Sequence, residues 1–195
     1  IPRGTEVTST VQTVLTGLGL TEVTVNVMPR VLVLTSGHEV IEPGESLTPG
    51  KIYNSNRAMI CGLLEDLGFH KITHYHVSDA PEELEAEINH VLQLSEEADI
   101  IISSGGVSVG LFDTMPHIYE KLGAQSIYAR IQMRPGAASY GAVTPKGQII
   151  FGLSGNPGAA FNGWHLIVAP TLKRYKGLVN WTTPVVACVM DSEIF

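Results

Sequence analysis

The run Val-Leu-Val-Leu at residues 31–34 contains no polar residue. A strand of this kind has to be covered on both faces, as the inner strands of parallel sheets are. A second buried strand is expected at 99–103, and amphipathic helices are expected at 54–67, 81–94 and 114–122. Strands that alternate with helices at this spacing imply right-handed crossovers and helices on both faces of a sheet. The sequence therefore predicts an α/β fold, a three-layer α/β/α domain with a mainly parallel sheet.

Other segments extend this scheme. Further strands are expected at 71–77 and 126–131, a long helix at 157–175, a weaker helix at 5–18 and a half-buried strand at 22–27, where valines alternate with polar residues. Two short strands at 140–144 and 148–151 are separated by Pro-Lys-Gly, which predicts a β-hairpin. The hairpin makes the expected sheet mixed.

Charge and composition exclude several classes of partner. The net charge is −7 and the 12 Lys and Arg residues are not clustered, which argues against nucleic acid or an anionic membrane as the main partner. No apolar run reaches membrane-spanning length. Cys61 and Cys188 lie far apart and form no paired metal spacing, which indicates a reducing environment and predicts a cytoplasmic location.

Four polar segments follow predicted strands. They are Ser36-Gly37-His38-Glu39, Ser78-Asp79, the Gly-rich segment 103–113 and Ser154-Gly155-Asn156-Pro157. In open α/β sheets the ligand lies beyond the carboxyl ends of the strands, at the point where the strand order reverses. We therefore expect these four segments to form one binding edge.

The Gly-rich segment is suited to binding an anion. Gly105, Gly106 and Gly110 lack a Cβ, so the backbone can adopt positive φ and bring several N–H groups close to a phosphate or oxyanion. The helix expected at 114–122 would add its positive end. One such loop is equally compatible with a tight turn, but four loops at equivalent strand ends favour a ligand site.

Three carboxylates belong to these segments: Glu39, Asp79 and Asp113. Carboxylates that meet at one edge repel each other, and Mg²⁺ with a bridging phosphate relieves this repulsion. The alternative role for Asp79 and Asp113 is to cap the helices that follow them. His74 and His76 share one face of a strand, and we interpret them as a surface-facing pair rather than as metal ligands.

Six ordered blocks of the sequence carry a family resemblance. They are Thr-Ser-Gly-His-Glu at 35–39, Ile-Tyr-Asn-Ser-Asn at 52–56, Val-Ser-Asp at 77–79, Ser-Ser-Gly-Gly-Val-Ser-Val-Gly at 103–110 with Asp113, Arg-Pro-Gly at 134–136 and Leu-Ser-Gly-Asn-Pro at 153–157. In this order they resemble the molybdopterin molybdenumtransferases, the MoeA and gephyrin E-domain family. The resemblance implies a MoaB/MogA-like molybdopterin-binding fold for residues 29–176. It also implies the end of a preceding domain at 1–28 and the start of a C-terminal β domain at 177–195.

The resemblance further implies the last step of molybdenum cofactor assembly. In that step molybdate is inserted into adenylylated molybdopterin with release of AMP, in a reaction that depends on Mg²⁺. Glu39, Asp79 and Asp113 would act in catalysis and hold the metal. The residues implied in binding the pterin and its phosphate are Ser36, Gly37, His38, Gly105, Gly106, Ser108, Gly110, Arg134, Pro135, Ser154, Gly155, Asn156 and Pro157. The resemblance also implies a homodimer for the full-length protein and the molybdopterin adenylyltransferase as a partner.

The chain departs from the family pattern at three places. His38 stands where family members usually have Asp, Ser154 replaces a usual Pro, and Ala137 and Ala138 replace the last two residues of a Lys-Pro-Gly-Lys-Pro block. The missing cation favours a molybdopterin-binding or scaffold module without catalysis. The three carboxylates favour an enzyme, because pure binding needs no cluster of like charges. A nucleotide pyrophosphatase on the same fold is the third reading.

Overall fold

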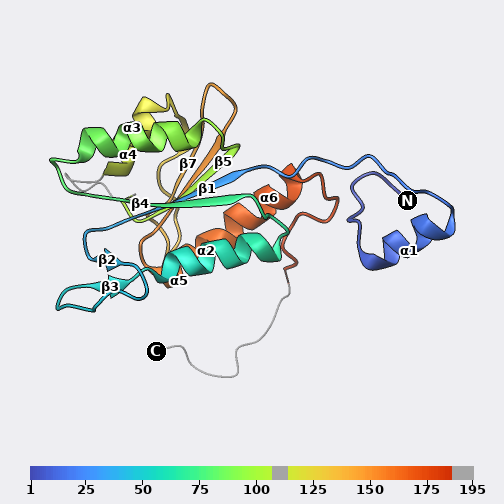
Figure 1. The fold of residues 1–195 in the computed structure, drawn as a ribbon, viewed down its shortest axis with the longest axis horizontal. Helices are drawn as coiled ribbons and strands as arrows, with labels where there is room; N and C mark the ends of the chain where they lie inside the picture. Colours follow the sequence, from blue (N-terminus) through green and yellow to red (C-terminus); the bar gives the residue numbers. More distant parts are fainter. Residues whose placement is uncertain (107–113, 186–195) are drawn as a thin grey trace.

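The computed structural model describes residues 1–106 and 114–185, and its centre is a six-stranded sheet in the order β4-β1-β5-β8-β7-β6 (Figure 1). The strands are β1 (Val31–Ser36), β4 (Ile72–Val77), β5 (Ile100–Ser104), β6 (Gln125–Tyr128), β7 (Tyr140–Val143) and β8 (Ile149–Leu153). Strands β4, β1, β5 and β8 are parallel, whereas β7 is antiparallel to both β8 and β6. The structure confirms the predicted mixed, mainly parallel sheet.

Helices cover both faces of the sheet (Figure 1). On one face, α2 (Ser55–Asp66) and the helical stretch 157–175 pack against Val31 and Val33 of β1. On the other, α3 (Leu84–Ser95) and α4 (Thr114–Lys121) pack against Leu32 and Leu34. The aliphatic run is therefore covered on both sides, which explains why it needs no polar residue.

The strand order reverses at β1. After β1 the chain continues to β4 on one side of it, and then crosses to β5 on the other side. The carboxyl ends of β1 and β5 therefore flank the point at which a crevice opens in folds of this type. A small parallel sheet of β2 (Val40–Ile41) and β3 (Ile52–Tyr53) follows β1, and two-residue strands carry too little pattern to be predicted.

The long helix predicted at 157–175 is present as α5 (Pro157–Gly163), the π-helical turn η1 (Trp164–Val168) and α6 (Ala169–Tyr175). Pro170 explains the π turn, because it has no N–H to donate and its ring would collide with the carbonyl one turn earlier. The N–H of Ala169 accordingly donates to the oxygen of Trp164, five residues back.

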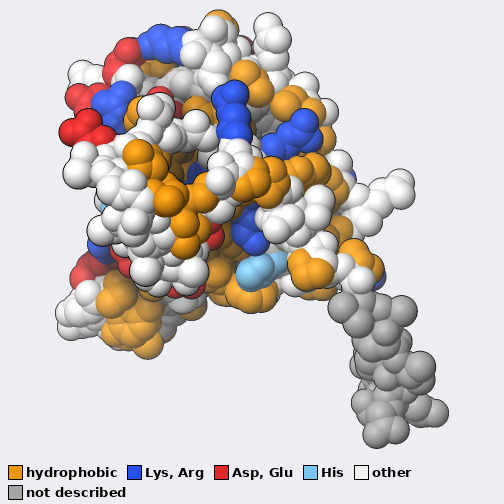
Figure 2. Space-filling view, turned by 90° about the vertical axis from the view of Figure 1, so that its right-hand side faces the viewer, with side chains coloured by type: hydrophobic (Ala, Val, Ile, Leu, Met, Phe, Trp, Pro, Cys, Tyr) orange, Lys and Arg blue, Asp and Glu red, His pale blue; other side chains and the backbone are white. Residues whose placement is uncertain are grey.

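The prediction of a strand at 22–27 is wrong. The segment has no regular structure, and Val25 and Val27 are 61% and 86% exposed. Alternating valines form a strand only when a neighbouring strand pairs with them, and no described residue does so here. The preceding helix α1 (Ser9–Gly17) buries none of its residues. Figure 2 shows hydrophobic side chains spread over this end of the molecule.

Helix α3 begins at Leu84, three residues later than predicted, because residues 81–83 form a turn. Asp79 is therefore too far from α3 to cap it, and the capping role proposed for this carboxylate is wrong. None of the described helices is both long enough and apolar enough to cross a membrane.

Candidate functional site

A cavity of about 440 Å³ lies at the carboxyl ends of β1, β5 and β8. Ten of the residues expected at the site line it: Ser36, Gly37, His38, Glu39, Asp79, Gly105, Gly106, Ser154, Gly155 and Pro157. Ser108, Gly110 and Asp113 lie outside the described residues. The structure thus brings together segments from four different parts of the chain, at the edge where parallel strands end.

Two glycines allow the loop after β5 to approach the end of β1 closely. Gly105 has φ +86°, and a Cβ added to it would lie 2.4 Å from the carbonyl oxygen of Ser36. Gly106 has φ +61°, and its Cβ would lie 2.6 Å from the hydroxyl oxygen of Ser36 and 2.8 Å from Cγ of Met115. Only glycine fits these two positions, since both the backbone conformation and the contact exclude a side chain.

Two polar atoms of the cavity wall have no partner in the part of the chain that the structure describes. The Oγ of Ser36 and the Oδ1 of Asn56 are buried, and neither has a hydrogen-bond partner among the described residues. A buried polar atom without a partner costs free energy, so a ligand that supplies the missing hydrogen bond gains affinity. Both residues line the cavity, which makes their oxygens candidate contacts for a bound molecule.

Asn56 also connects the loops around the cavity. Its Nδ2 donates to Ser104 Oγ at 2.7 Å and to the carbonyl oxygen of Gly155 at 2.8 Å, and Ser104 Oγ donates to the oxygen of Ser154 at 3.1 Å. The loops after β5 and β8 are thereby joined through the start of α2. Neither Asn56 nor Ser104 was predicted as a site residue, although both stand in the sequence blocks described above.

Asn156 has a structural role at the same edge. It is the N-cap of α5, and its Oδ1 accepts from the N–H of Ala159 at 3.1 Å. Ser154 Oγ in turn accepts from the N–H of Asn156 at 3.3 Å. These bonds hold the Ser-Gly-Asn-Pro turn in shape, and Asn156 itself is not among the residues that line the cavity.

Glu39 and Asp79 supply the negative charge of the cavity. Glu39 lies 3.6 Å from Nδ1 of His38 and its side chain is 45% exposed. Among the described residues no group of three or more His, Cys, Asp or Glu could hold a metal ion. Two carboxylates with nearby hydroxyl oxygens still suit Mg²⁺, which is commonly held by one or two carboxylates together with phosphates of the substrate. The donor set therefore fits Mg²⁺ in the presence of a phosphorylated ligand.

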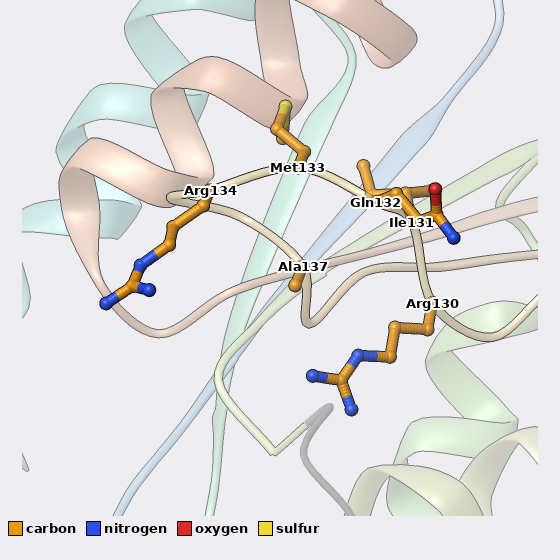
Figure 3. A pocket seen from close by; sticks show the side chains of 6 residues that line it. All are labelled: Arg130, Ile131, Gln132, Met133, Arg134 and Ala137. Carbon is orange, nitrogen blue, oxygen red and sulfur yellow. The ribbon is translucent and has the colours of Figure 1, made fainter.

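A second cavity, of about 550 Å³, is lined by the loop that follows β6. Arg130 and Arg134 both line it, and Figure 3 shows their side chains on the opposite side of the loop from Met133, with Ala137 between them. Neither guanidinium forms an ion pair with any described residue. Arg134 was expected in the first cavity but lines this one instead, and Pro135 lines neither. Arg130, four residues before Arg134, was not predicted.

His74 and His76 do not face the solvent as predicted. Both are half-buried, and both contact the hydroxyl of Thr35 on β1, through His74 Nε2 at 3.0 Å and His76 Nδ1 at 3.1 Å. The register that pairs Val33 with His74 and Thr35 with His76 turns these side chains toward the same face. Burial, together with the positive charge of Arg57, lowers the pKa of His74 to about 4, against a smaller opposing effect of Glu42.

This shift in the pKa of His74 predicts that stability falls in acid. Between pH 6.5 and about 4 the unfolded chain binds a proton at His74 and the folded chain does not, so the free energy of unfolding decreases as the pH drops. His74→Gln removes this titration and should show a smaller decrease over the same range. Urea unfolding at pH 7.5, 5.5 and 4.5 measures the difference, with the exposed His117→Gln as control. Equal pH dependence in the wild type and His74→Gln would contradict the prediction.

Comparison with known proteins places the chain in a family. Residues 32–174 match the family described as "Probable molybdopterin binding domain". The molybdopterin molybdenumtransferase of Staphylococcus epidermidis is 38% identical over 175 residues, which are 90% of this chain and 41% of that protein. That of Staphylococcus aureus is 39% identical over 167 residues, 86% of this chain and 39% of that protein. The chain thus spans about two fifths of the length of these curated relatives.

Solved structures agree with this assignment. The molybdopterin biosynthesis MoeA protein from Pyrococcus horikoshii superposes with a TM-score of 0.74 at 28% identity, over 91% of this chain and 43% of that one. The tungsten cofactor synthesizing protein MoaB from Pyrococcus furiosus has a TM-score of 0.54 at 18% identity, over 77% of this chain and 96% of that one, and shows the fold alone. The chain therefore belongs to the molybdopterin-binding domain family, and molybdopterin molybdenumtransferases are among its relatives.

Proposed function

We propose that this chain is the molybdopterin-binding part of a molybdopterin molybdenumtransferase. In the proposed reaction molybdate is inserted into adenylylated molybdopterin and AMP is released. The observation that carries the proposal is the meeting of Glu39, Asp79 and the Gly105–Gly106 turn in one cavity at the edge where the strand order reverses. A phosphorylated ligand bound there faces both anion-binding backbone and carboxylates, as a metal-assisted cleavage of a pyrophosphate requires.

Different residues of the chain would bind the two anionic substrates. Gly105 and Gly106 line the cavity without side chains, so a phosphate bound there would lie against their backbone, and Ser36 Oγ, which has no hydrogen-bond partner among the described residues, can donate to it. Arg130 and Arg134, which have no ion-pair partner among the described residues, attract the second anion, molybdate, to the neighbouring cavity. Ala138, in the same loop as the two arginines, lines the first cavity, so the two cavities are neighbours. Each cavity would then hold one of the two anionic substrates.

Glu39 and Asp79, with Asp113 as the third carboxylate, would hold Mg²⁺. When bound, Mg²⁺ supplies positive charge that neutralises the phosphates and polarises the bond to be cleaved. Without it the two carboxylates repel the pyrophosphate, so substrate binding and metal binding should depend on each other. A cytoplasmic location, a homodimer of the longer protein and a molybdopterin adenylyltransferase as the donor of substrate complete the proposal.

One experiment separates this function from its alternatives. AMP release from adenylylated molybdopterin is measured with and without molybdate, in the presence of Mg²⁺. A molybdenumtransferase releases AMP in a molybdate-dependent manner, a pyrophosphatase releases it equally without molybdate, and a binding module releases none. The altered Arg-Pro-Gly-Ala-Ala block is the specific observation in favour of the binding module, because it lacks a cation next to Arg134.

The arginines provide a separate prediction. Arg134→Ala should weaken molybdate binding about 10- to 100-fold, as expected for the loss of a charged hydrogen bond. Arg130→Ala should have an effect of the same order, because both side chains line the same cavity. Calorimetric titration with molybdate gives the dissociation constant, and Arg3→Ala, at an exposed position near the N-terminus, is the control. An unchanged dissociation constant in both variants would show that molybdate does not bind in this cavity.

A further inference from the structure

The hydroxyl of Thr35 is the centre of a buried hydrogen-bond network. Thr35 is 2% exposed, and its Oγ1 accepts from Nδ2 of Asn54 at 2.9 Å. The same oxygen contacts Nε2 of His74 at 3.0 Å and Nδ1 of His76 at 3.1 Å. A hydroxyl has one proton and two lone pairs, so three partners saturate it. One histidine must therefore accept the proton of Thr35 while the other donates its own.

Asn54 connects the hydrogen-bond network of Thr35 to the cavity. Its Nδ2 also donates to Glu42 Oε1 at 2.8 Å, and its Oδ1 accepts from the N–H of Arg57 at 3.1 Å, which caps α2. Three of the four hydrogen-bonding positions of the Asn54 side chain are thus in use: both Nδ2 protons and one lone pair of Oδ1. Asn54 is 3% exposed and can be displaced only if these bonds break.

The small sheet that carries Glu39 is attached to the same residue. The N–H of Asn54 donates to the oxygen of Ile41 at 2.8 Å, and the N–H of Ile52 donates to the oxygen of Glu39 at 2.8 Å. Glu42 is held in turn by Arg57, whose Nη1 lies 2.5 Å from Oε2 of Glu42. Burial raises the pKa of Glu42, but the hydrogen bonds from Asn54 and Arg57 outweigh this effect and lower it, which keeps Glu42 charged.

We propose that His74 and His76 are positioning residues that hold the Glu39 segment, residues 37–53, at the cavity through Thr35 and Asn54. Thr35 and Asn54 line the cavity, whereas neither histidine does, so the histidines act only through them. The inference rests on the proposed function only in the role that it gives to Glu39. The network itself consists of contacts between described residues.

Amide hydrogen exchange tests the proposal on the protein without any ligand. His74→Leu and His76→Leu should each speed exchange in residues 38–53 about five- to tenfold, as expected for the loss of one buried hydrogen bond, while β5 and β8 exchange as in the wild type. His74→Gln and His76→Asn should restore slow exchange, because Gln places a polar atom near the position of Nε2 and Asn near that of Nδ1. His70→Leu, at an exposed position before the same strand, is the control.

Three results would overturn the inference. They are wild-type exchange in 38–53 in both folded leucine variants, acceleration spread evenly over the whole domain, or Gln and Asn variants that behave like their leucine counterparts. If a leucine variant fails to fold, its Gln or Asn counterpart is compared with the wild type, and exchange in 38–53 that is faster than in the wild type would then contradict the inference. Binding of Mn²⁺, used in place of Mg²⁺, is measured on the same proteins in the presence of adenylylated molybdopterin and should weaken in step with faster exchange. A wild type that binds no Mn²⁺ counts against the proposed function, while the exchange data still decide the role of the histidines.

Discussion

Asp79→Ala is expected to lower metal-dependent AMP release by at least about a hundredfold, because the variant loses one of two carboxylates that the structure places in the cavity. Glu39, the carboxylate of the described residues that then remains in the cavity, is half-exposed and would hold a divalent ion weakly. The concentration of Mg²⁺ needed for half-maximal AMP release should rise as well. A steady-state assay over a range of Mg²⁺ concentrations measures both effects.

The fold should tolerate this change. Asp79 lies outside the strands and helices, and α3 starts five residues later without a side-chain cap. The circular dichroism spectrum should therefore stay close to that of the wild type, and the thermal midpoint measures how much the contacts of Asp79 contribute to stability. Asp66→Ala is the matched control, because Asp66 is an exposed carboxylate at the far end of α2. Undiminished turnover in Asp79→Ala would refute the assignment of this residue.

Gly105→Ala is expected to destabilise the protein by about 2–4 kcal/mol and to abolish ligand binding. The added methyl group would lie 2.4 Å from the carbonyl oxygen of Ser36, and φ of +86° is unfavourable for any residue with a Cβ. The loop can relieve the clash only by moving away from the end of β1. This movement would open the cavity at the place where the phosphate is proposed to bind.

A second glycine provides the control for this measurement. A Cβ on Gly62, within α2, would meet nothing within 4 Å, so Gly62→Ala should stabilise the helix by about 0.5–1 kcal/mol. Urea unfolding gives both free energies, and titration with molybdopterin gives the affinities. Gly105→Ala with the stability and the affinity of the wild type would show that the close approach of the two loops has no functional part.

The sequence predicted the layers and the sheet because the main elements carry strong local patterns. The run at 31–34 and the helix at 54–67 could be predicted from periodicity alone, and Gly68, with φ +80°, ends that helix as expected. The segment 22–27 shows the limit of this reasoning. Alternation indicates a face to be buried, but whether another strand pairs with that face depends on the tertiary structure.

The site could be predicted only where the residues follow strands directly. Ser36–Glu39, Asp79 and Gly105–Gly106 lie at one edge because parallel strands end at the same edge of a sheet. The position of Arg134 could not be predicted, because it depends on the course of the eleven-residue loop between β6 and β7. The histidine contacts were likewise missed, because the register of β4 against β1 decides which side chains reach Thr35.

The most direct measurement is a crystal structure of the chain with adenylylated molybdopterin and Mn²⁺, in which anomalous scattering locates the ion. We expect one ion, bound directly by oxygens of Glu39 and Asp79 and by a phosphate oxygen of the ligand. We also expect that phosphate to lie against the backbone of Gly105 and Gly106. An ion bound away from both carboxylates, or a ligand outside the cavity at the ends of β1 and β5, would contradict the proposed function.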